Sequence, residues 1–208
     1  MTTIYLIRHS EPFKVHRGIE DVHEEFLFSN IKTPLSVDGE KLAEKVSQNK
    51  EFQNIDVVWS SNYVRAMSTA KYFAYNNDLK VNVSDKLGER IHGVNSWDEL
   101  PPDFERRQFL DENYKIGYGE NQKEVRERLY SVIMQILNEN KNKRIVIICH
   151  ATAISFLLKK WCDIKVVDDK LNYSYNGKQL LKGHFNYCET FKLEFDDKNE
   201  IVNIENIK

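Results

Sequence analysis

The sequence is poor in cysteine, proline and glycine, and it lacks a long hydrophobic run. The three cysteines, Cys149, Cys162 and Cys188, form no C-x-x-C pair, which argues against a disulfide framework and a structural zinc site. No apolar run reaches the roughly 18 residues that a membrane-spanning helix needs, and the N-terminus shows no signal peptide. We therefore expect a single domain over residues 1–208, with reduced thiols, in the cytoplasm.

An excess of charge of either sign is also missing. The chain has 30 Lys and Arg against 32 Asp and Glu, a formal net charge of −2. No overall field attracts nucleic acid or an anionic membrane, so we expect neither as a partner. Any affinity for anions must come from a local cluster. The length of 208 residues suits one α/β domain with a well-buried core.

What the sequence does contain is an alternation of apolar strands and amphipathic helices. Such an alternation predicts right-handed crossovers and a mainly parallel sheet with helices on both faces. A C-terminal hairpin would make the sheet mixed, and residues 91–120 form a helical insert. We expect strands over residues 3–8, 55–59, 80–83 and 144–149, helices after Ser36 and over 64–73, 103–113, 121–140 and 153–162, a loop over 11–33, and a hairpin of 187–195 with 201–204.

Polar side chains follow three of these strands where the strands end. Arg8-His9 follows the first strand, Ser60-Ser61 precedes Arg65, and His150 ends the strand over 144–149. Open α/β sheets bind ligands at the carboxyl ends of their strands. Arginine forks match phosphate oxygens, and we expect the helix start after His150 to face a bound anion. The sequence predicts a cationic cup for a phosphoryl group.

The same residues suggest a reaction. Neighbouring positive charge lowers the pKa of an imidazole, so we expect His9 to be neutral and able to attack phosphorus. The surrounding cations would stabilise charge on the phosphoryl oxygens in the transition state. Glu89 is the candidate proton donor for the leaving alcohol, because burial beside a phosphate dianion would raise its pKa.

Several motifs, in order along the chain, resemble the histidine phosphatase superfamily, the phosphoglycerate-mutase-like proteins. The resemblance implies that His9 becomes phosphorylated and that Glu89 donates a proton. It also implies that Arg8, Arg65 and His150 bind the phosphoryl group, and that the fold is a three-layer α/β/α sandwich. The matching segments are Arg8-His9, Thr33-Pro34-Leu35-Ser36-x-x-Gly39, Ser60-Ser61-x-x-x-Arg65-Ala66-x-x-Thr69-Ala70, Leu87-x-Glu89 with Gly93, Gly119-Glu120 with Glu124-Val125-x-x-Arg128, and Val146 to His150.

The sequence departs from the family pattern at four positions, which puts the substrate in doubt. Ser10 and Ala151 stand where glycine is usual, and Pro12 and Val15 replace a small hydroxyl residue and an asparagine. We predict a phosphomonoester hydrolase for a small phosphorylated metabolite. A phosphoglycerate mutase and an inactive phosphate-binding protein are the alternatives, and the oligomeric state is open.

We expect no metal and no other cofactor, because the arginines neutralise the phosphoryl charge. His16 and His23 complete no metal-ligand set, and together with Arg17, His92 and His184 they are predicted to be solvated or structural. We expect Cys149 to be a buried apolar residue. Residues 13–31 and 91–118 are predicted to wall the site. Four aromatic residues of the insert either cap the substrate or pack the insert, and we expect packing for most of them: Phe104, Phe109, Tyr114 and Tyr118.

Overall fold

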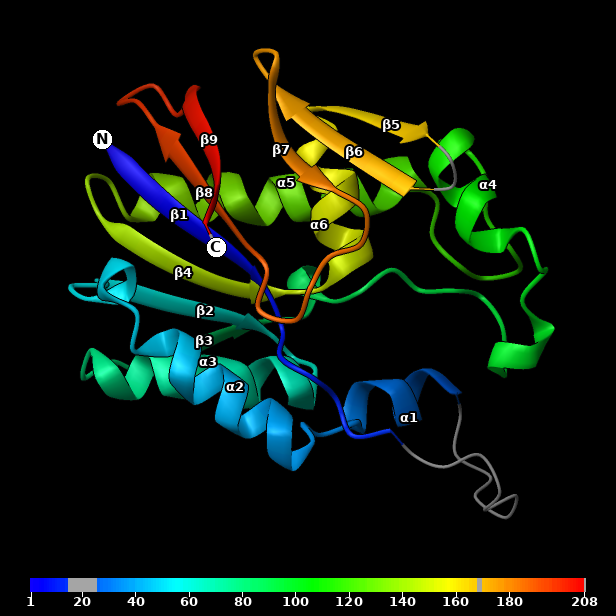
Figure 1. Ribbon diagram of the computed structural model, residues 1–208, viewed down its shortest axis with the longest axis horizontal. Coiled ribbons are helices and arrows are strands. Elements are labelled where there is room, and N and C mark those ends of the chain that lie inside the picture. Colours follow the sequence, from blue (N-terminus) through cyan, green and yellow to red (C-terminus); the bar gives the residue numbers. More distant parts are fainter. Residues whose placement is uncertain (15–25, 168–169, 208) are drawn as a thin grey trace.

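The computed structural model describes residues 1–14, 26–167 and 170–207, and its centre is a six-stranded mixed sheet (Figure 1). The strand order is β3-β2-β4-β1-β8-β9. The first four strands in that order are parallel, and β8 and β9 run antiparallel at one edge. The prediction of a mainly parallel sheet closed by an antiparallel hairpin is confirmed. The strands are β1 Thr2–Arg8, β2 Val57–Ser61, β3 Val81–Ser84, β4 Arg144–Cys149, β8 Thr190–Phe195 and β9 Ile201–Ile207.

Helices cover both faces of this sheet. In Figure 1, α2 Val37–Ser47 and α3 Val64–Asn76 lie below it, and α5 Gln122–Glu139 and α6 Ala151–Leu158 lie above it. Alternate residues of the central strands divide between the two layers. Ile4 and Leu6 join the core beneath α5, whereas Tyr5 and Ile7 join the core beside α3. Burial on both faces explains why β1 and β4 are apolar without interruption.

Side-chain hydrogen bonds cap the N-termini of two predicted helices. The Ser36 side chain accepts a hydrogen bond from the Gly39 N–H and caps α2. Asn121 and Glu124 form a reciprocal capping box at the start of α5. The predicted helices at these positions are confirmed. The remaining helical elements are α1 Phe26–Lys32, α4 Phe104–Leu110 and three short 3-10 helices, η1 Lys50–Phe52, η2 Asp85–Leu87 and η3 Trp97–Glu99.

Two parts of the fold differ from the sequence prediction. Helix α1 lies inside the segment 11–33, so the prediction of a loop is wrong over its residues. A second, three-stranded antiparallel sheet also forms, for which no strand was expected. Its strands are β5 Asp163–Val167, β6 Lys170–Tyr175 and β7 Lys178–Lys182. The sequence does carry one signal for it: Asn176-Gly177 both adopt positive φ in the turn between β6 and β7.

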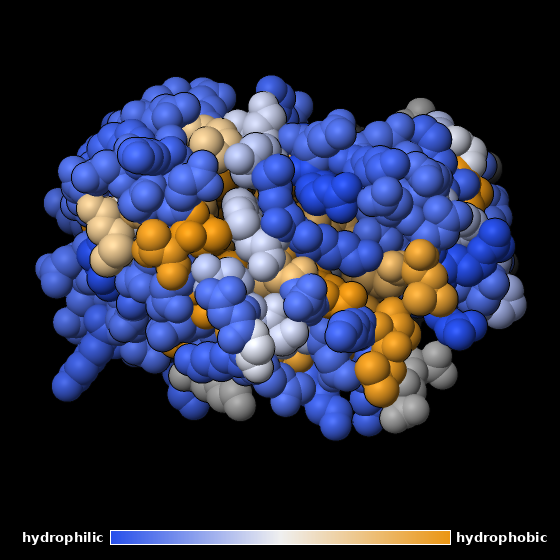
Figure 2. Space-filling model, turned by 90° about the horizontal axis from the view of Figure 1, so that it is seen from above, coloured by the Kyte–Doolittle hydropathy of each residue, from blue (hydrophilic) through white to orange (hydrophobic). Residues whose placement is uncertain are grey.

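The view from above shows a mostly hydrophilic face, with hydrophobic residues in short bands between charged ones (Figure 2). Within the described residues, no helix is long and apolar enough to span a membrane.

Candidate active site

The carboxyl ends of β2, β4 and β1 bring the predicted site residues to one edge of the sheet. Because β4 lies between β2 and β1, with Arg8 opposite Cys149 and Ser60 opposite Ile148, the next residues of all three strands meet there. The rings of His9 and His150 lie 5.1 Å apart, centroid to centroid. Both histidines are buried. The sequence places them 141 positions apart, and the parallel pairing of β1 with β4 joins them.

His9 presents an unprotonated nitrogen to the site. Its Nδ1 lies 2.7 Å from the Ser10 carbonyl oxygen, which can only accept, so Nδ1 carries the proton. Nε2 is then a free lone pair, and it accepts a hydrogen bond from Arg65 Nε at 3.1 Å. Burial, followed by the charges on Arg65 and Arg8, lowers the pKa of His9 well below the usual value for histidine. The expected direction holds, with burial as the larger cause.

His150 is held from three sides. Its Nε2 lies 2.7 Å from Ser61 Oγ, and its Nδ1 lies 3.4 Å from Arg65 Nη2. The Tyr63 ring packs edge-on at 4.6 Å between centroids. Burial, then Arg65 and His9, lower the pKa of His150 well below the ordinary range. Ser61 and Tyr63 thus orient the second imidazole. The Ser60-Ser61 motif signalled the first of these contacts, but nothing in the sequence signalled the role of Tyr63.

Arg65 joins the two histidines and reaches a third partner. Its Nη1 donates to the Asn30 carbonyl oxygen at 2.6 Å, at the end of α1. One planar guanidinium therefore contacts His9, His150 and the main chain of α1 at once. The structure brings His9, Arg65 and His150 together as expected. The Asn30 contact was missed because the segment was expected to be a loop.

Arg8 turns toward a segment that the sequence prediction left out of the site. Its Nη1 donates to the Phe185 carbonyl oxygen at 2.6 Å, and its guanidinium carbon lies 4.4 Å from the centroid of the Tyr187 ring. The Arg8 Nε is buried and has no hydrogen-bond partner among the residues that the structure describes. An unpaired buried donor is costly, so this N–H is suited to donate to an anionic oxygen of a substrate. Tyr187 arrives here because the antiparallel pairing of β8 with β1 returns the chain to the end of β1.

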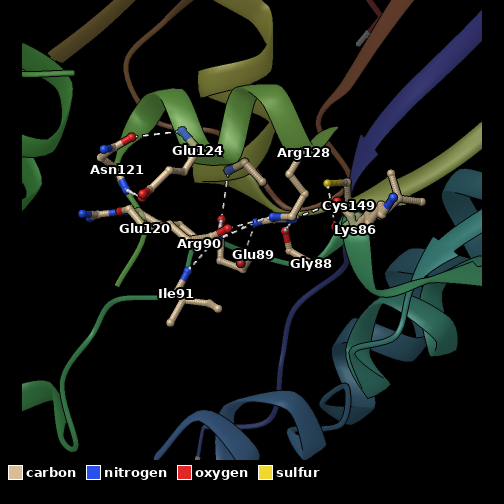
Figure 3. A network of polar contacts seen from close by, with 12 residues as sticks. Lys86, Gly88, Glu89, Arg90, Ile91, Glu120, Asn121, Glu124, Arg128 and Cys149 are labelled. Atoms are coloured by element: carbon tan, nitrogen blue, oxygen red, sulfur yellow. Dashed lines mark hydrogen bonds and ion pairs between the residues drawn. The ribbon is translucent and has the colours of Figure 1, made fainter. Parts of the chain in front are cut away.

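Glu89 lies against the start of α6 (Figure 3). One carboxylate oxygen accepts from the N–H groups of Arg90 and Ala153, each at 2.9 Å, and the other accepts from Thr152 at 3.3 Å. The Glu89 carboxylate therefore takes up two N–H groups of this helix start, those of Thr152 and Ala153, and the expectation that the helix start faces a bound anion stays a prediction. A carboxylate satisfies free N–H groups at a helix start for the same electrostatic reason.

Ser10, Thr69 and Gly39 fix the backbone beneath the cup. The Ser10 N–H donates to Thr69 Oγ1 at 3.0 Å, and Ser10 Oγ donates to the Gly39 carbonyl oxygen at 2.7 Å. The hydroxyl that distinguishes Ser10 from the usual glycine thus ties β1 to α2. A Cβ on Gly39 would lie 2.1 Å from the Glu11 carbonyl oxygen. The Ser36-x-x-Gly39 motif therefore combines a helix cap with a close backbone approach.

Other candidate groups lie apart from this chemistry. His92 is buried against the rings of Trp97 and Phe104, and Cys149 is buried with its pKa raised to about 12. Both behave as structural residues, as predicted. His184 is exposed. Phe104 packs on Tyr114, and Phe109 packs on Phe156.

No group of three or more metal-ligating side chains gathers within the described ranges. The predictions for Val15, His16, Arg17 and His23 lie outside those ranges.

Comparisons with known proteins agree with this arrangement. A family model of the histidine phosphatase superfamily (branch 1) matches residues 4–197. Phosphoserine phosphatase 1 of Hydrogenobacter thermophilus is 25% identical over 81% of this chain and 78% of its own length. A probable phosphoglycerate mutase GpmB of Yersinia enterocolitica is 27% identical over 76% of this chain and 74% of its own.

Solved structures share the fold. A phosphoserine phosphatase from Entamoeba histolytica in complex with 3-phosphoglyceric acid superimposes with a TM-score of 0.67 at 20% identity, covering 100% of this chain and 98% of that one. A mycobacterial glucosyl-3-phosphoglycerate phosphatase with inorganic phosphate gives a TM-score of 0.71 at 17% identity, covering 99% and 95%.

Proposed function

The chain belongs to the histidine phosphatase superfamily, and from that premise we propose that it hydrolyses phosphomonoesters of small metabolites through a phosphohistidine formed on His9. One observation carries the proposal. A single guanidinium, that of Arg65, contacts both His9 Nε2 and His150 Nδ1 at the carboxyl edge of the sheet. A phosphoryl group bound there would meet a nucleophile and several fixed donors together.

The first step forms a phosphorus–nitrogen bond and breaks the ester bond. His9 Nε2 attacks phosphorus while Arg65, His150 and the unpaired Arg8 Nε donate to the phosphoryl oxygens. Arg65 exchanges its contact with His9 for one with the substrate. The departing alcohol oxygen takes a proton from Glu89, which must first take one up from the solvent or from the substrate.

The second step returns the enzyme to its starting state. Water attacks the phosphohistidine, the phosphorus–nitrogen bond breaks, and Glu89 accepts the proton that the water loses. The products are the alcohol and inorganic phosphate, with one water consumed. The positive charges in this scheme come from Arg8 and Arg65, while the neutral His150 contributes only a hydrogen bond, and the proposed reaction uses no metal and no other cofactor.

The relatives support two alternative reactions. The phosphoserine phosphatases support a small phosphorylated amino acid or hydroxy acid. The relatives named probable phosphoglycerate mutase support the alternative, in which the phosphoryl group passes to a second hydroxyl. Conversion of 3-phosphoglycerate with and without 2,3-bisphosphoglycerate separates the two. A bisphosphate-dependent mutase activity that exceeds hydrolysis would favour the alternative.

The intermediate can be tested directly. Wild type and His9→Ala are incubated with an aryl phosphate, and the phosphoenzyme is trapped by rapid quenching. We expect an acid-labile, alkali-stable phosphoryl group on His9 of the wild type and loss of turnover in the variant. Equal rates for the two proteins would refute the proposal. A screen of phosphorylated metabolites, repeated with a chelator, then identifies the substrate class and tests the absence of a metal.

We propose a cytoplasmic setting and a single domain for the enzyme. The three cysteines are free and buried, which supports a reducing compartment such as the cytoplasm. The two cores on either side of the main sheet draw residues from β1 at one end of the chain and β9 at the other, which supports a single domain over residues 1–208.

A further inference from the structure

Arg128 of α5 holds the backbone of the segment that carries Glu89. Its Nη1 donates to the carbonyl oxygens of Lys86 at 2.8 Å and Gly88 at 3.1 Å. Its Nη2 lies 3.4 Å from the carbonyl oxygen of Glu89 itself. Figure 3 shows this guanidinium reaching from the helix to the 86–89 segment. One side chain therefore fixes the chain on both sides of Gly88.

Glu120 completes the clamp. Arg128 Nε and Nη2 each donate to one Glu120 oxygen, both at 2.8 Å, in the paired geometry that only arginine offers. Glu120 Oε2 also accepts the Ile91 N–H at 3.0 Å, and the Glu120 N–H donates to the Ile91 carbonyl oxygen at 2.9 Å. The pair thus anchors the backbone immediately before and shortly after Glu89.

A third anchor comes from the sheet. The Cys149 thiol, at the end of β4, donates to the Leu87 carbonyl oxygen at 3.1 Å. With these carbonyls held, the Glu89 side chain can only extend toward α6, where Thr152 and Ala153 receive it. Ala153 lies three residues after His150, so the acid has a fixed relation to the cup.

Arg126 supplies a contrast on the same helix. It lies two residues before Arg128 and pairs with Glu112 at 3.3 Å, at the edge of the insert. Within the part of the chain that the structure describes, the hydrogen bonds of Arg128 go instead to Glu120 and to the 86–89 backbone. The three contacts with carbonyl oxygens of the 86–89 segment therefore indicate that Arg128 does more than add a positive charge to α5.

We propose that Arg128, paired with Glu120, is a positioning residue for the proton donor. It touches neither substrate nor phosphoryl group and acts through the placement of Glu89. The inference rests on the proposed role of Glu89 in proton transfer. A general acid must lie within hydrogen-bonding distance of the atom that it protonates. A misplacement of about 1 Å can lower the rate about a hundredfold.

The test compares two substrates that differ in their need for an acid. 4-Nitrophenyl phosphate releases a stable phenolate, whereas an alkyl phosphate that the wild type hydrolyses releases an alkoxide that must be protonated. The measured quantity is kcat/KM, which covers only the steps up to loss of the leaving group. Arg128→Met is expected to lower it about a hundredfold for the alkyl ester and less than about fivefold for the aryl ester.

Glu89→Gln is expected to give the same selective loss of kcat/KM. The double variant Glu89→Gln with Arg128→Met should lose no more activity than Glu89→Gln alone, because the two residues act as one unit. Arg126→Met is the matched control and keeps both activities. Where Arg128→Met does not fold, Arg128→Lys keeps the charge without the fork, and it should show a smaller loss with the same selectivity. Thermal melts compare the folding of all these variants.

An equal loss on both substrates, or no loss, in Arg128→Met or its lysine counterpart overturns the inference. A selective loss in Glu89→Gln without one at Arg128 refutes only the positioning role. Absence of selectivity in Glu89→Gln removes the proton donor from the proposed mechanism, and the inference about Arg128 fails with it. The phosphohistidine on His9 is tested separately by trapping.

Discussion

The guanidinium of Arg8 lies over the ring of Tyr187, with 4.4 Å between its central carbon and the ring centroid. The same ring lies 6.4 Å from that of His9. Tyr187 therefore packs against the first arginine of the proposed cup, and it lies near the nucleophile. A cation over an aromatic face gains roughly 0.5–2 kcal/mol, depending on desolvation.

We predict that Tyr187→Ala raises KM by about two- to thirtyfold, from the loss of that contact energy. Tyr187→Phe keeps the ring and is expected to stay within about twofold of wild type, because the aromatic face against Arg8 remains. Steady-state kinetics with an aryl phosphate measures both. Matching losses in the two variants would assign the effect to the hydroxyl instead of the ring.

Arg65 is predicted to be the least replaceable cation of the site. Lysine carries the same charge but cannot donate to His9, His150 and Asn30 from one planar group. We expect Arg65→Lys to lower kcat/KM by about 10²- to 10³-fold, the usual cost of one lost transition-state donor. Arg107→Lys, on the exposed side of α4, is the control. Near-wild-type kinetics in Arg65→Lys would contradict the shared contact with both histidines.

The central strands and the histidine cluster could be predicted from sequence because each leaves a local trace. Strands β1 and β4 are uninterrupted apolar runs, and each is followed by a histidine at a position that the parallel pairing must bring to one edge. The helix caps at Ser36 and Asn121 are equally local. Such features can be predicted from the local residue pattern together with the general rules of sheet topology.

Other features depend on tertiary packing and left no such trace. The Glu89 carboxylate binds α6 because the folded 86–91 segment faces that helix. The Arg8–Tyr187 contact requires β8 to pair beside β1, which a hairpin prediction alone does not specify. Helix α1 is short and its contact with the site uses a carbonyl oxygen, which every residue carries. Most residues of the strands β5 to β7 are exposed or partly buried, and each strand includes lysine, so their apolar signal is weak.

Stability is predicted to fall as the solution becomes acidic below the ordinary pKa of histidine. Burial, then Arg90 and Arg65, lower the pKa of His92 from 6.5 to about 4. Between these values the unfolded chain binds a proton that the folded chain does not, so protonation favours unfolding. The free energy of unfolding should fall by about 1.4 kcal/mol per pH unit for each such histidine. His9 and His150 add to the slope in the same direction.

His92→Phe tests the contribution of one group, because the ring remains packed against Trp97 and Phe104. Urea unfolding at pH 7, 6, 5 and 4 should give a shallower pH dependence for the variant, by about one proton. An unchanged slope would show that His92 titrates normally in the folded protein. Activity in the same range separates this effect from catalysis, since His9 should keep its nucleophilic nitrogen unprotonated below pH 6.5.

Gly39 offers the sharpest test of how the backbone builds the cup. A Cβ at this position would lie 2.1 Å from the Glu11 carbonyl oxygen, and that carbonyl also accepts the Ser36 N–H. The Gly39 carbonyl in turn receives the Ser10 hydroxyl, directly after His9. Gly39→Ala must therefore push the exit of β1 away from α2, at a cost of about 2–4 kcal/mol in the free energy of unfolding.

The displacement should also reach catalysis, because Ser10 supplies the carbonyl that orients His9 Nδ1. We expect a kcat/KM reduced by about tenfold or more at temperatures where the variant is folded. Gly177→Ala is the contrasting substitution: it has positive φ but no atom within 4 Å of the added Cβ. It should cost about 1 kcal/mol from backbone conformation and leave activity intact. If Gly39→Ala lost no more stability than Gly177→Ala, the close approach of Glu11 would not explain the glycine at position 39, and the motif would have no special connection to the site.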